Sequence, residues 1–198
     1  MILRVFPSRT SMTPDDAYAF VGDPPLWRPE ADGVDVSVSF TWDIMEGRRL
    51  TDAWRQYYPN VRLGGPAIDG EGDEFIPGLY LKYGITLTSR GCPKSCPWCL
   101  VGGHNLRLLE IKPGYIIQDN NFLATGRSHM TKVFEMLRSQ RRAAIFSGGL
   151  DATLVNDWVA SELKGLRISR VFLAADTEDS LNALARARLK LSFLPRNK

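Results

Sequence analysis

The chain has 198 residues, of which 44% are hydrophobic and 24% are charged, and its formal net charge is +3. This composition excludes a disordered chain, and the length suits one large domain or two small ones. No apolar run is long enough to cross a bilayer, and residues 1–7 lack the length and flanks of a signal peptide. The cluster Arg138, Arg141 and Arg142 is typical of a solvated helix end, so we do not expect nucleic-acid binding. We expect a soluble protein of the reducing cytoplasm.

Residues 1–68 predict a small Rossmann-like α/β layer with the element order β-α-β-α-β. Thr13 begins a predicted helix that runs to about Val21, because a threonine cap is followed by Pro14 and by two acids near the positive helix end. The other expected elements are strands at 2–6, 34–40 and 61–63 and a helix at 49–58.

A polar, glycine-containing stretch, residues 69–82, is interpreted as a linker to a second α/β region at 83–198. Its first strand is expected from Ile85 to Thr88. The later expected strands are 115–119, 143–147, 170–175 and a stub at 191–194, and the expected helices are 129–141, 152–163 and 178–189. Residues 148–151 are interpreted as the turn after the third strand, and Asp151 as the cap of the next helix.

All three cysteines, Cys92, Cys96 and Cys99, lie within eight consecutive residues directly after the strand expected to end at Thr88. Thiolates that converge on one metal centre explain this spacing, because thiolate is a preferred ligand of iron–sulfur clusters and zinc. Disulfides are not expected, since the count is odd and nothing indicates secretion. A zinc site is usually closed by four protein ligands. The alternative that remains open is a non-catalytic binding module stabilised by zinc, with His104 as the fourth ligand.

The Cys-x3-Cys-x2-Cys spacing, the aromatic Trp98 before the last cysteine and the preceding run Thr88–Gly91 resemble the signature of the radical S-adenosylmethionine (SAM) enzymes. The resemblance implies that the three cysteines bind a [4Fe–4S] cluster whose open iron is chelated by SAM. One electron from the cluster would then cleave SAM to a 5′-deoxyadenosyl radical, which abstracts hydrogen from a substrate. It also implies an electron donor protein, and an incomplete (β/α) partial barrel of the radical SAM type over residues 83–198.

The resemblance further implies SAM-binding residues at strand ends. In this family the strand after the cluster loop receives the SAM amino group, often through a Gly-Gly-Glu run. Here the run is Asp119, Asn120 and Asn121, whose oxygens can accept from an ammonium group, or else make a turn or helix cap. Asp176 is expected either to contact the ribose or methionine part of SAM or to cap a helix. Trp98 is expected to pack near the SAM adenine, or else within its own loop.

The first region resembles the vestigial N-terminal domain of radical SAM families related to the cobalamin-binding ones. Members that bind cobalamin carry an Asp-x-His-x-x-Gly loop, whereas the histidines here are His104 and His129, so we do not expect cobalamin to be bound through a lower histidine ligand. The family core usually has six β/α units, and from Ile85 we count four and a fifth strand. We therefore expect a truncated core, with another chain as a candidate to cover its open sheet edge.

Overall fold

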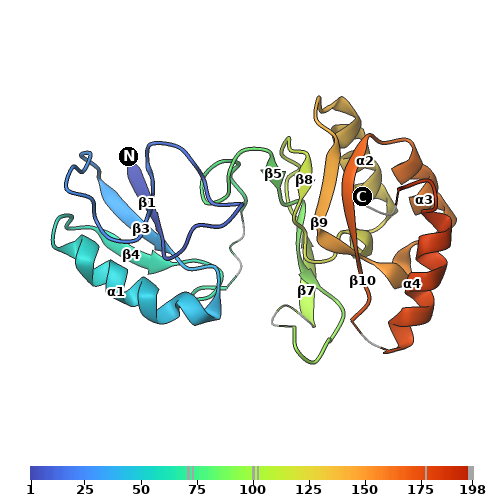
Figure 1. Ribbon diagram of the computed structural model, residues 1–198, viewed down its shortest axis with the longest axis horizontal. Coiled ribbons are helices and arrows are strands. Elements are labelled where there is room, and N and C mark those ends of the chain that lie inside the picture. The colour runs from blue at the N-terminus through green and yellow to red at the C-terminus, as the bar shows by residue number, and fades with distance from the viewer. Residues whose placement is uncertain (71, 73, 100, 102, 177, 196–198) are drawn as a thin grey trace. The chain divides into compact units, whose positions relative to one another are not determined.

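The structure is a computed structural model that describes residues 1–70, 72, 74–99, 101, 103–176 and 178–195. The chain divides into two compact units, Met1–Tyr83 and Gly84–Lys198. Each unit contains a parallel sheet and at least one helix, which confirms the α/β class (Figure 1). None of the described helices is both long and apolar enough to cross a membrane.

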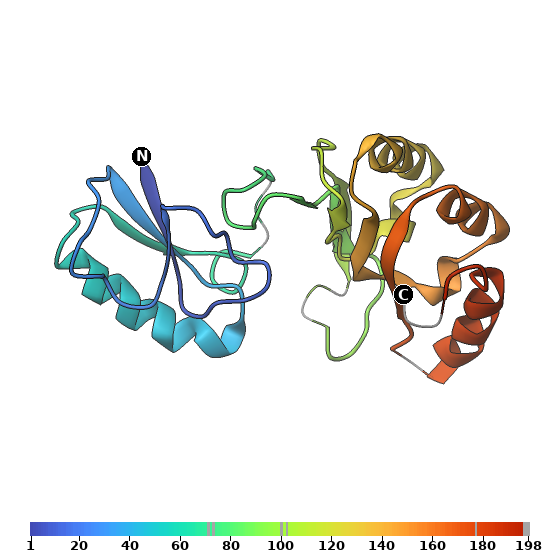
Figure 2. The ribbon, with the colours of Figure 1, turned by 45° about the horizontal axis from the view of Figure 1, so that its top comes forward.

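The first unit is a four-stranded parallel sheet with the order β2-β1-β3-β4, covered on one face by helix α1 (Figure 2). The elements are β1 (Ile2–Phe6), β2 (Ala19–Val21), β3 (Gly33–Ser37), a short 3-10 turn (Thr41–Asp43), α1 (Ile44–Arg55) and β4 (Val61–Gly64). Apolar side chains of β1 and β3 pack against Leu50 and Trp54 of α1, and both of these are fully buried. This contact is the core of the unit.

The helix expected from Thr13 to Val21 is wrong, because the edge strand β2 occupies the end of this segment. The buried Arg4 explains the difference. Its guanidinium is paired with Asp16, and its backbone N–H donates to the Tyr18 carbonyl, 2.9 Å away. The Asp16 carboxylate also accepts the Tyr18 N–H at 3.0 Å, which makes a turn in place of a helix cap. Tertiary contacts therefore override the local helix signal, and the element order of the unit is β-β-β-α-β.

Trp54 fixes α1 to the loop that follows β2, because its indole N–H donates to the Gly22 carbonyl at 3.1 Å. We expect Trp54→Phe to lower the free energy of unfolding of this unit by about 1–2 kcal/mol, since it removes that bond and leaves a void. Hydrogen exchange of the β1 and β3 amides measures the loss. Trp42→Phe is the control, because Trp42 is 75% exposed, and protection that is equal in both variants would contradict the prediction.

The segment interpreted as a linker contacts the first unit over part of its length. Arg4 donates from Nη1 to the carbonyl oxygens of Gly78 and Leu79, at 3.0 and 2.8 Å. The Tyr80 hydroxyl donates to Asp35 of β3. These bonds join residues 78–80 to two neighbouring strands of the sheet.

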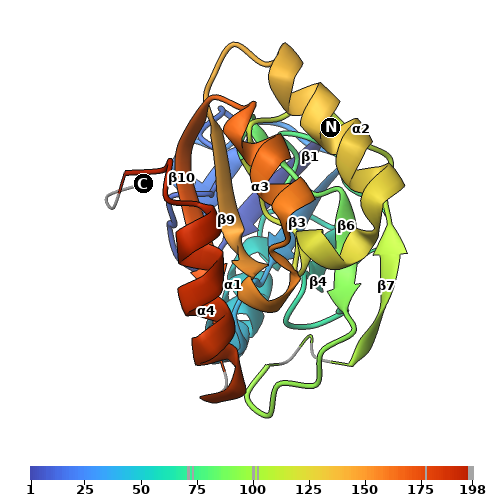
Figure 3. The same cartoon turned by 90° about the vertical axis from the view of Figure 1, so that its right-hand side faces the viewer.

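The second unit is a parallel sheet with the order β10-β9-β8-β5, in which each strand lies beside the next parallel strand along the chain. The helices of this unit cover one face of the sheet (Figure 3). The elements of this layer are β5 (Ile85–Thr86), β8 (Ile116–Ile117), α2 (Arg127–Ser139), β9 (Ala144–Asp151), α3 (Asp157–Lys164), β10 (Ile168–Ala174) and α4 (Glu178–Lys190), with 3-10 turns at Phe122–Thr125 and Ala152–Leu154. The core between sheet and helices is centred on Phe122, Phe134 and Phe146.

Two predicted boundaries in this unit are wrong by more than two residues. Strand β9 continues through residues 148–149, which the sequence predicts as a turn. A β-bulge lies there, because the register of β9 and β10 shifts between the pairs Phe146–Val171 and Leu150–Leu173. Gly149, within the bulge, has φ +83°. The next α-helix begins at Asp157 and not at residue 152, because the Asn156 side chain caps it by accepting the Val159 N–H at 2.9 Å.

Residues 191–194, expected as a strand stub, form a turn after α4. Leu191 is buried, and Leu194 packs against the same core, so the apolar pattern here reflects contact with the core rather than sheet pairing. The sheet thus has four parallel strands among the residues that the structure describes.

Candidate functional site

The cysteines lie on a β-hairpin that follows β5. Its strands are β6 (Ser89–Cys92) and β7 (His104–Leu108), which pair in antiparallel register with Cys92 opposite His104. Between them the loop is held by bonds from the Cys99 N–H to the Cys96 carbonyl, 3.0 Å, and from the Gly103 N–H to the Lys94 carbonyl, 2.6 Å. The strands expected from the sequence do not include β7, although the alternation in Asn-Leu-Arg-Leu is a period-two signal that could have revealed it.

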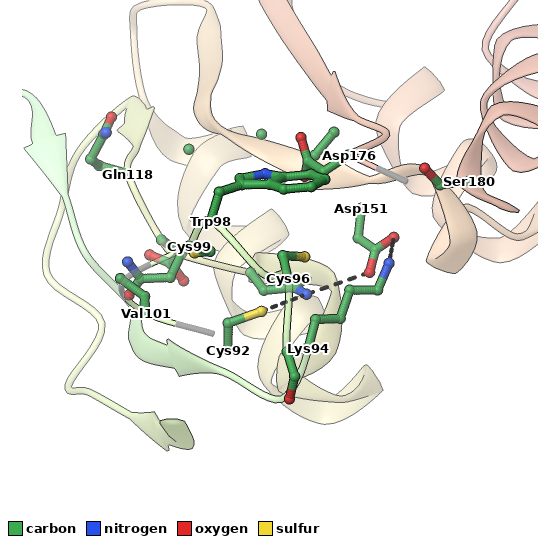
Figure 4. Close-up of a pocket in the computed structure, with 17 residues that line it drawn as sticks. Cys92, Lys94, Cys96, Trp98, Cys99, Val101, Gln118, Asp151, Asp176 and Ser180 are labelled. Atoms are coloured by element: carbon green, nitrogen blue, oxygen red, sulfur yellow. Dashed lines mark hydrogen bonds and ion pairs between the residues drawn. The ribbon is translucent and has the colours of Figure 1, made fainter. Parts of the chain in front are cut away.

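This loop and the ends of three strands line one pocket of about 710 Å³ (Figure 4). The carboxyl ends of parallel strands meet at the same edge of a sheet, which is where ligands bind in α/β proteins. All the site residues that the sequence predicts line this pocket: Cys92, Cys96, Trp98, Cys99, Asp119, Asn120, Asn121 and Asp176. The structure therefore brings together residues that are up to 84 positions apart.

The three cysteines are unpaired thiols; Cys92 and Cys96 are half-buried and Cys99 is exposed. In the described part of the chain, no three His, Cys, Asp or Glu side chains are grouped closely enough to hold a single metal ion. A [4Fe–4S] cluster takes each thiolate on a different iron, so its ligands surround a volume rather than a point. Three soft sulfur donors around one pocket suit such a group. The side chain of His104, the fourth ligand of the zinc alternative, lies outside the described residues.

Asp119 holds the junction between β5 and β6. Its buried carboxylate accepts from the Thr88 N–H at 2.7 Å, from the Thr88 hydroxyl at 2.6 Å and from the Ser89 hydroxyl at 2.7 Å. Burial raises the pKa of Asp119, and these bonds oppose the rise. The carboxylate thus faces the start of the cysteine hairpin, and it positions the strand that carries Cys92.

The two asparagines that follow also contact the hairpin. The Asn120 side-chain oxygen accepts the Gly91 N–H at 3.1 Å, and Asn121 Nδ2 lies 3.4 Å from the Cys92 sulfur. Asn121 is 4% exposed, and its Oδ1 has no hydrogen-bond partner among the residues that the structure describes. A buried acceptor without a partner is costly, so this oxygen is a candidate to receive a donor from a ligand in the pocket.

An ion pair that the sequence does not predict ties the cysteine loop to the end of β9; its carboxylate is buried, and its lysine side chain is 41% exposed. Lys94 Nζ lies 2.8 Å from Oδ1 of Asp151, a residue that is 4% exposed. Burial alone would raise the pKa of Asp151, but hydrogen bonds from Lys94 and Thr153 outweigh it and hold the pKa below its ordinary value. The sequence predicts Asp151 as a cap, and it does cap a turn, accepting the Thr153 N–H at 3.0 Å. A charged residue inside the cysteine motif is a signal that an ion pair forms there, but it does not identify the partner.

Trp98 and Asp176 line the pocket from two different segments, the cysteine loop and the end of β10. Trp98 is 67% exposed, so its ring is accessible to a ligand. Asp176 is also exposed, and residue 177, which precedes α4, lies outside the described residues. The roles predicted for both residues stay predictions.

His129 extends the hydrogen-bond network beneath the hairpin. It is 7% exposed, and its Nε2 lies 3.1 Å from the Thr88 hydroxyl oxygen. Because Thr88 donates its own proton to Asp119, that oxygen accepts from His129, whose Nε2 therefore carries a proton. Burial lowers the pKa of His129 below its ordinary value of 6.5, although the nearby Asp119 opposes this shift.

The free energy of unfolding should therefore fall as the pH drops below 6.5 toward the lowered pKa of folded His129. The sign follows because the unfolded chain takes up the proton first, so acid favours the unfolded state through this window. We expect His129→Gln to lose less stability than the wild type over this pH range. Urea unfolding from about pH 7.5 to about pH 5 measures how the free energy of unfolding of each protein changes with pH. An equal change in the wild type and in His129→Gln would contradict the prediction.

The pocket thus combines three thiols, a shielded amide oxygen without a described partner, an ion pair with a buried carboxylate, and an exposed indole. Sulfur donors suit a soft metal centre, while the amide oxygen and the indole suit a ligand with a donor group and an aromatic ring. Comparison of the chain with protein-family models, with curated proteins and with solved structures found no match.

Proposed function

We propose that this chain is a radical SAM protein, in which Cys92, Cys96 and Cys99 hold a [4Fe–4S] cluster and SAM occupies the rest of the pocket. The observation that carries the proposal is that the cysteine loop and the polar ends of the neighbouring strands line one pocket. The bound cluster and SAM would supply the one-electron cleavage that releases a 5′-deoxyadenosyl radical. The chain's own residues would hold the reactants, orient them and limit access of water.

The arrangement of the second unit supports this proposal. Its strands β5, β8, β9 and β10 lie in chain order, with the helices on one face. This is the pattern of β/α barrels, whereas in doubly wound sheets the strand order reverses at a switch point. The cysteine loop follows the first of these strands, and it lies at the edge where barrel enzymes place their sites. We therefore propose a partial (β/α) barrel for residues 84–198.

Among the three polar residues after β8, Asn121 is the one that we assign to the SAM amino group. The oxygens of Asp119 and Asn120 already accept from the hairpin, whereas Asn121 Oδ1 has no partner in the described structure. Trp98 would stack on the adenine, and Asp176 would accept from the ribose hydroxyls. An electron donor protein, a cytoplasmic location and a substrate that enters the same pocket complete the proposal.

One observation favours the zinc-stabilised binding module as a second candidate. The hairpin register sets His104 directly opposite Cys92, so the backbone of a fourth possible ligand is close to the first cysteine. In that case Cys92, Cys96, Cys99 and His104 would close a structural site, and no catalysis would follow.

Anaerobic reconstitution of the purified chain with iron and sulfide tests the two candidates together. We expect a brown protein with a broad visible absorption band, and formation of 5′-deoxyadenosine when SAM and a reductant are added. A colourless protein that keeps one zinc per chain through the same treatment would support the module and contradict the radical SAM proposal.

A further inference from the structure

The Asn121 carboxamide lies between the sulfur of one proposed cluster ligand and a buried carboxylate. Its Nδ2 is 3.4 Å from the Cys92 sulfur and 3.5 Å from Oδ2 of Asp151. Asn121 and Asp151 are each 4% exposed, whereas Cys92 is half-buried. The orientation of a polar group in such a position is determined by its protein neighbours rather than by solvent.

The two neighbours determine which end of the amide faces them. A thiolate and an ionised carboxylate are both acceptors, so the NH2 group must face them, and the flipped amide would place an oxygen against two acceptors. Asp151 is itself held by Lys94 at 2.8 Å and by the Thr153 hydroxyl at 2.7 Å. The ion pair therefore fixes the carboxylate, and the carboxylate fixes the direction of the amide N–H groups.

We infer that Asn121 sets the reduction potential of the cluster by donating an N–H to the Cys92 sulfur, with Lys94 and Asp151 as positioning residues. This inference rests on the proposed function. Hydrogen bonds to cluster sulfurs tune the potential, as do second-shell partners of metal ligands in general. The reduced cluster carries one more negative charge than the oxidised one, so a donor on its thiolate stabilises the reduced form more and raises the potential.

The test is a redox titration of the reconstituted wild type and of Asn121→Leu, followed by the electron paramagnetic resonance signal of the reduced cluster. Leucine keeps the approximate size of the side chain and removes the donor. We expect equal iron content but a lower potential, with the reduced-to-oxidised ratio at fixed potential falling by up to about tenfold, which corresponds to about 59 mV for one electron.

Gln118→Leu is the matched control, because it replaces another pocket-lining amide near the end of β8. The Gln118 oxygen accepts from the Ser147 hydroxyl on β9, so its side chain is engaged away from the cysteine loop. We expect this variant to keep the wild-type potential. An equal shift in both variants would show that any loss of polarity lowers the potential, and it would overturn the assignment to Asn121.

The outcomes separate this inference from the proposed function. A wild-type chain that takes up no cluster overturns both, whereas an intact cluster with an unchanged potential in Asn121→Leu overturns the inference alone. If Asn121→Leu does not hold a cluster, the redox titration is repeated with Asn121→Asp. The carboxylate keeps the size, lacks the N–H groups and adds negative charge, so we expect a fall in potential at least as large. A potential equal to or above that of the wild type would overturn the inference.

Discussion

Cys96→Ala is expected to reduce cluster loading to background and to abolish 5′-deoxyadenosine formation. Cys96 is half-buried in the loop that lines the pocket, and its loss would leave two sulfur ligands where a cubane with one open iron needs three. The fold should survive, because Cys96 belongs to neither hydrophobic core. Iron and sulfide analysis and the visible spectrum measure the loss, and far-ultraviolet circular dichroism checks the fold.

Two control variants sharpen this result. Ser95→Ala changes the neighbouring residue of the same loop and should load like the wild type. His104→Ala should also load a cluster, because the proposed site takes no histidine ligand. Were His104→Ala alone to strip the metal, the zinc-stabilised module would replace the radical SAM proposal.

Gly148→Ala should destabilise the second unit by about 2–3 kcal/mol and displace the polar residues after β8. A Cβ at this position would lie 2.1 Å from the Asp119 carbonyl oxygen and 3.2 Å from the Asp119 nitrogen. Both are backbone atoms, which cannot move aside as the tip of a flexible side chain can. The bulged strand β9 and the end of β8 would have to separate, and Asp119 and Asn121 would shift with them. Urea unfolding and cluster loading measure the two effects.

Gly165→Ala provides the comparison, because it makes the same chemical change without a clash. Its φ is −80°, and the nearest atom to an added Cβ is the Glu162 carbonyl oxygen at 3.5 Å, an ordinary contact. We expect a change in the free energy of unfolding within about 0.5 kcal/mol. If Gly148→Ala proved as stable as Gly165→Ala, the close approach of β8 and β9 described here would be incorrect.

The features that could be predicted from the sequence are those that depend on local patterns. The apolar runs around Ile85, Ile117 and Phe146 identify strands, whereas the metal-binding role that the cysteine spacing predicts stays a prediction. Because parallel strands end at one edge, the polar residues that follow β8 and β10 could be expected to lie near the cysteine loop, and they line the same pocket.

The features that could not be predicted depend on partners far away in the sequence. Arg4 pairs with Asp16 and turns a helix-like segment into a sheet edge. Lys94 pairs with Asp151 across 57 positions, and no local pattern connects a lysine in a cysteine motif to the third strand of a sheet. The bulge in β9 likewise arises from its register with β10, which is a property of the pair of strands.

The strand order of the second unit has a consequence for biosynthesis. The cysteine hairpin leaves the ribosome before β9, so the thiols emerge before the carboxylate that anchors their loop. At this stage the thiols of the nascent chain are accessible, because the pocket has not yet formed around them. They can therefore be oxidised or bind free metal ions. Under the proposed function, a [4Fe–4S] cluster could enter the finished pocket only after translation has passed Asp151.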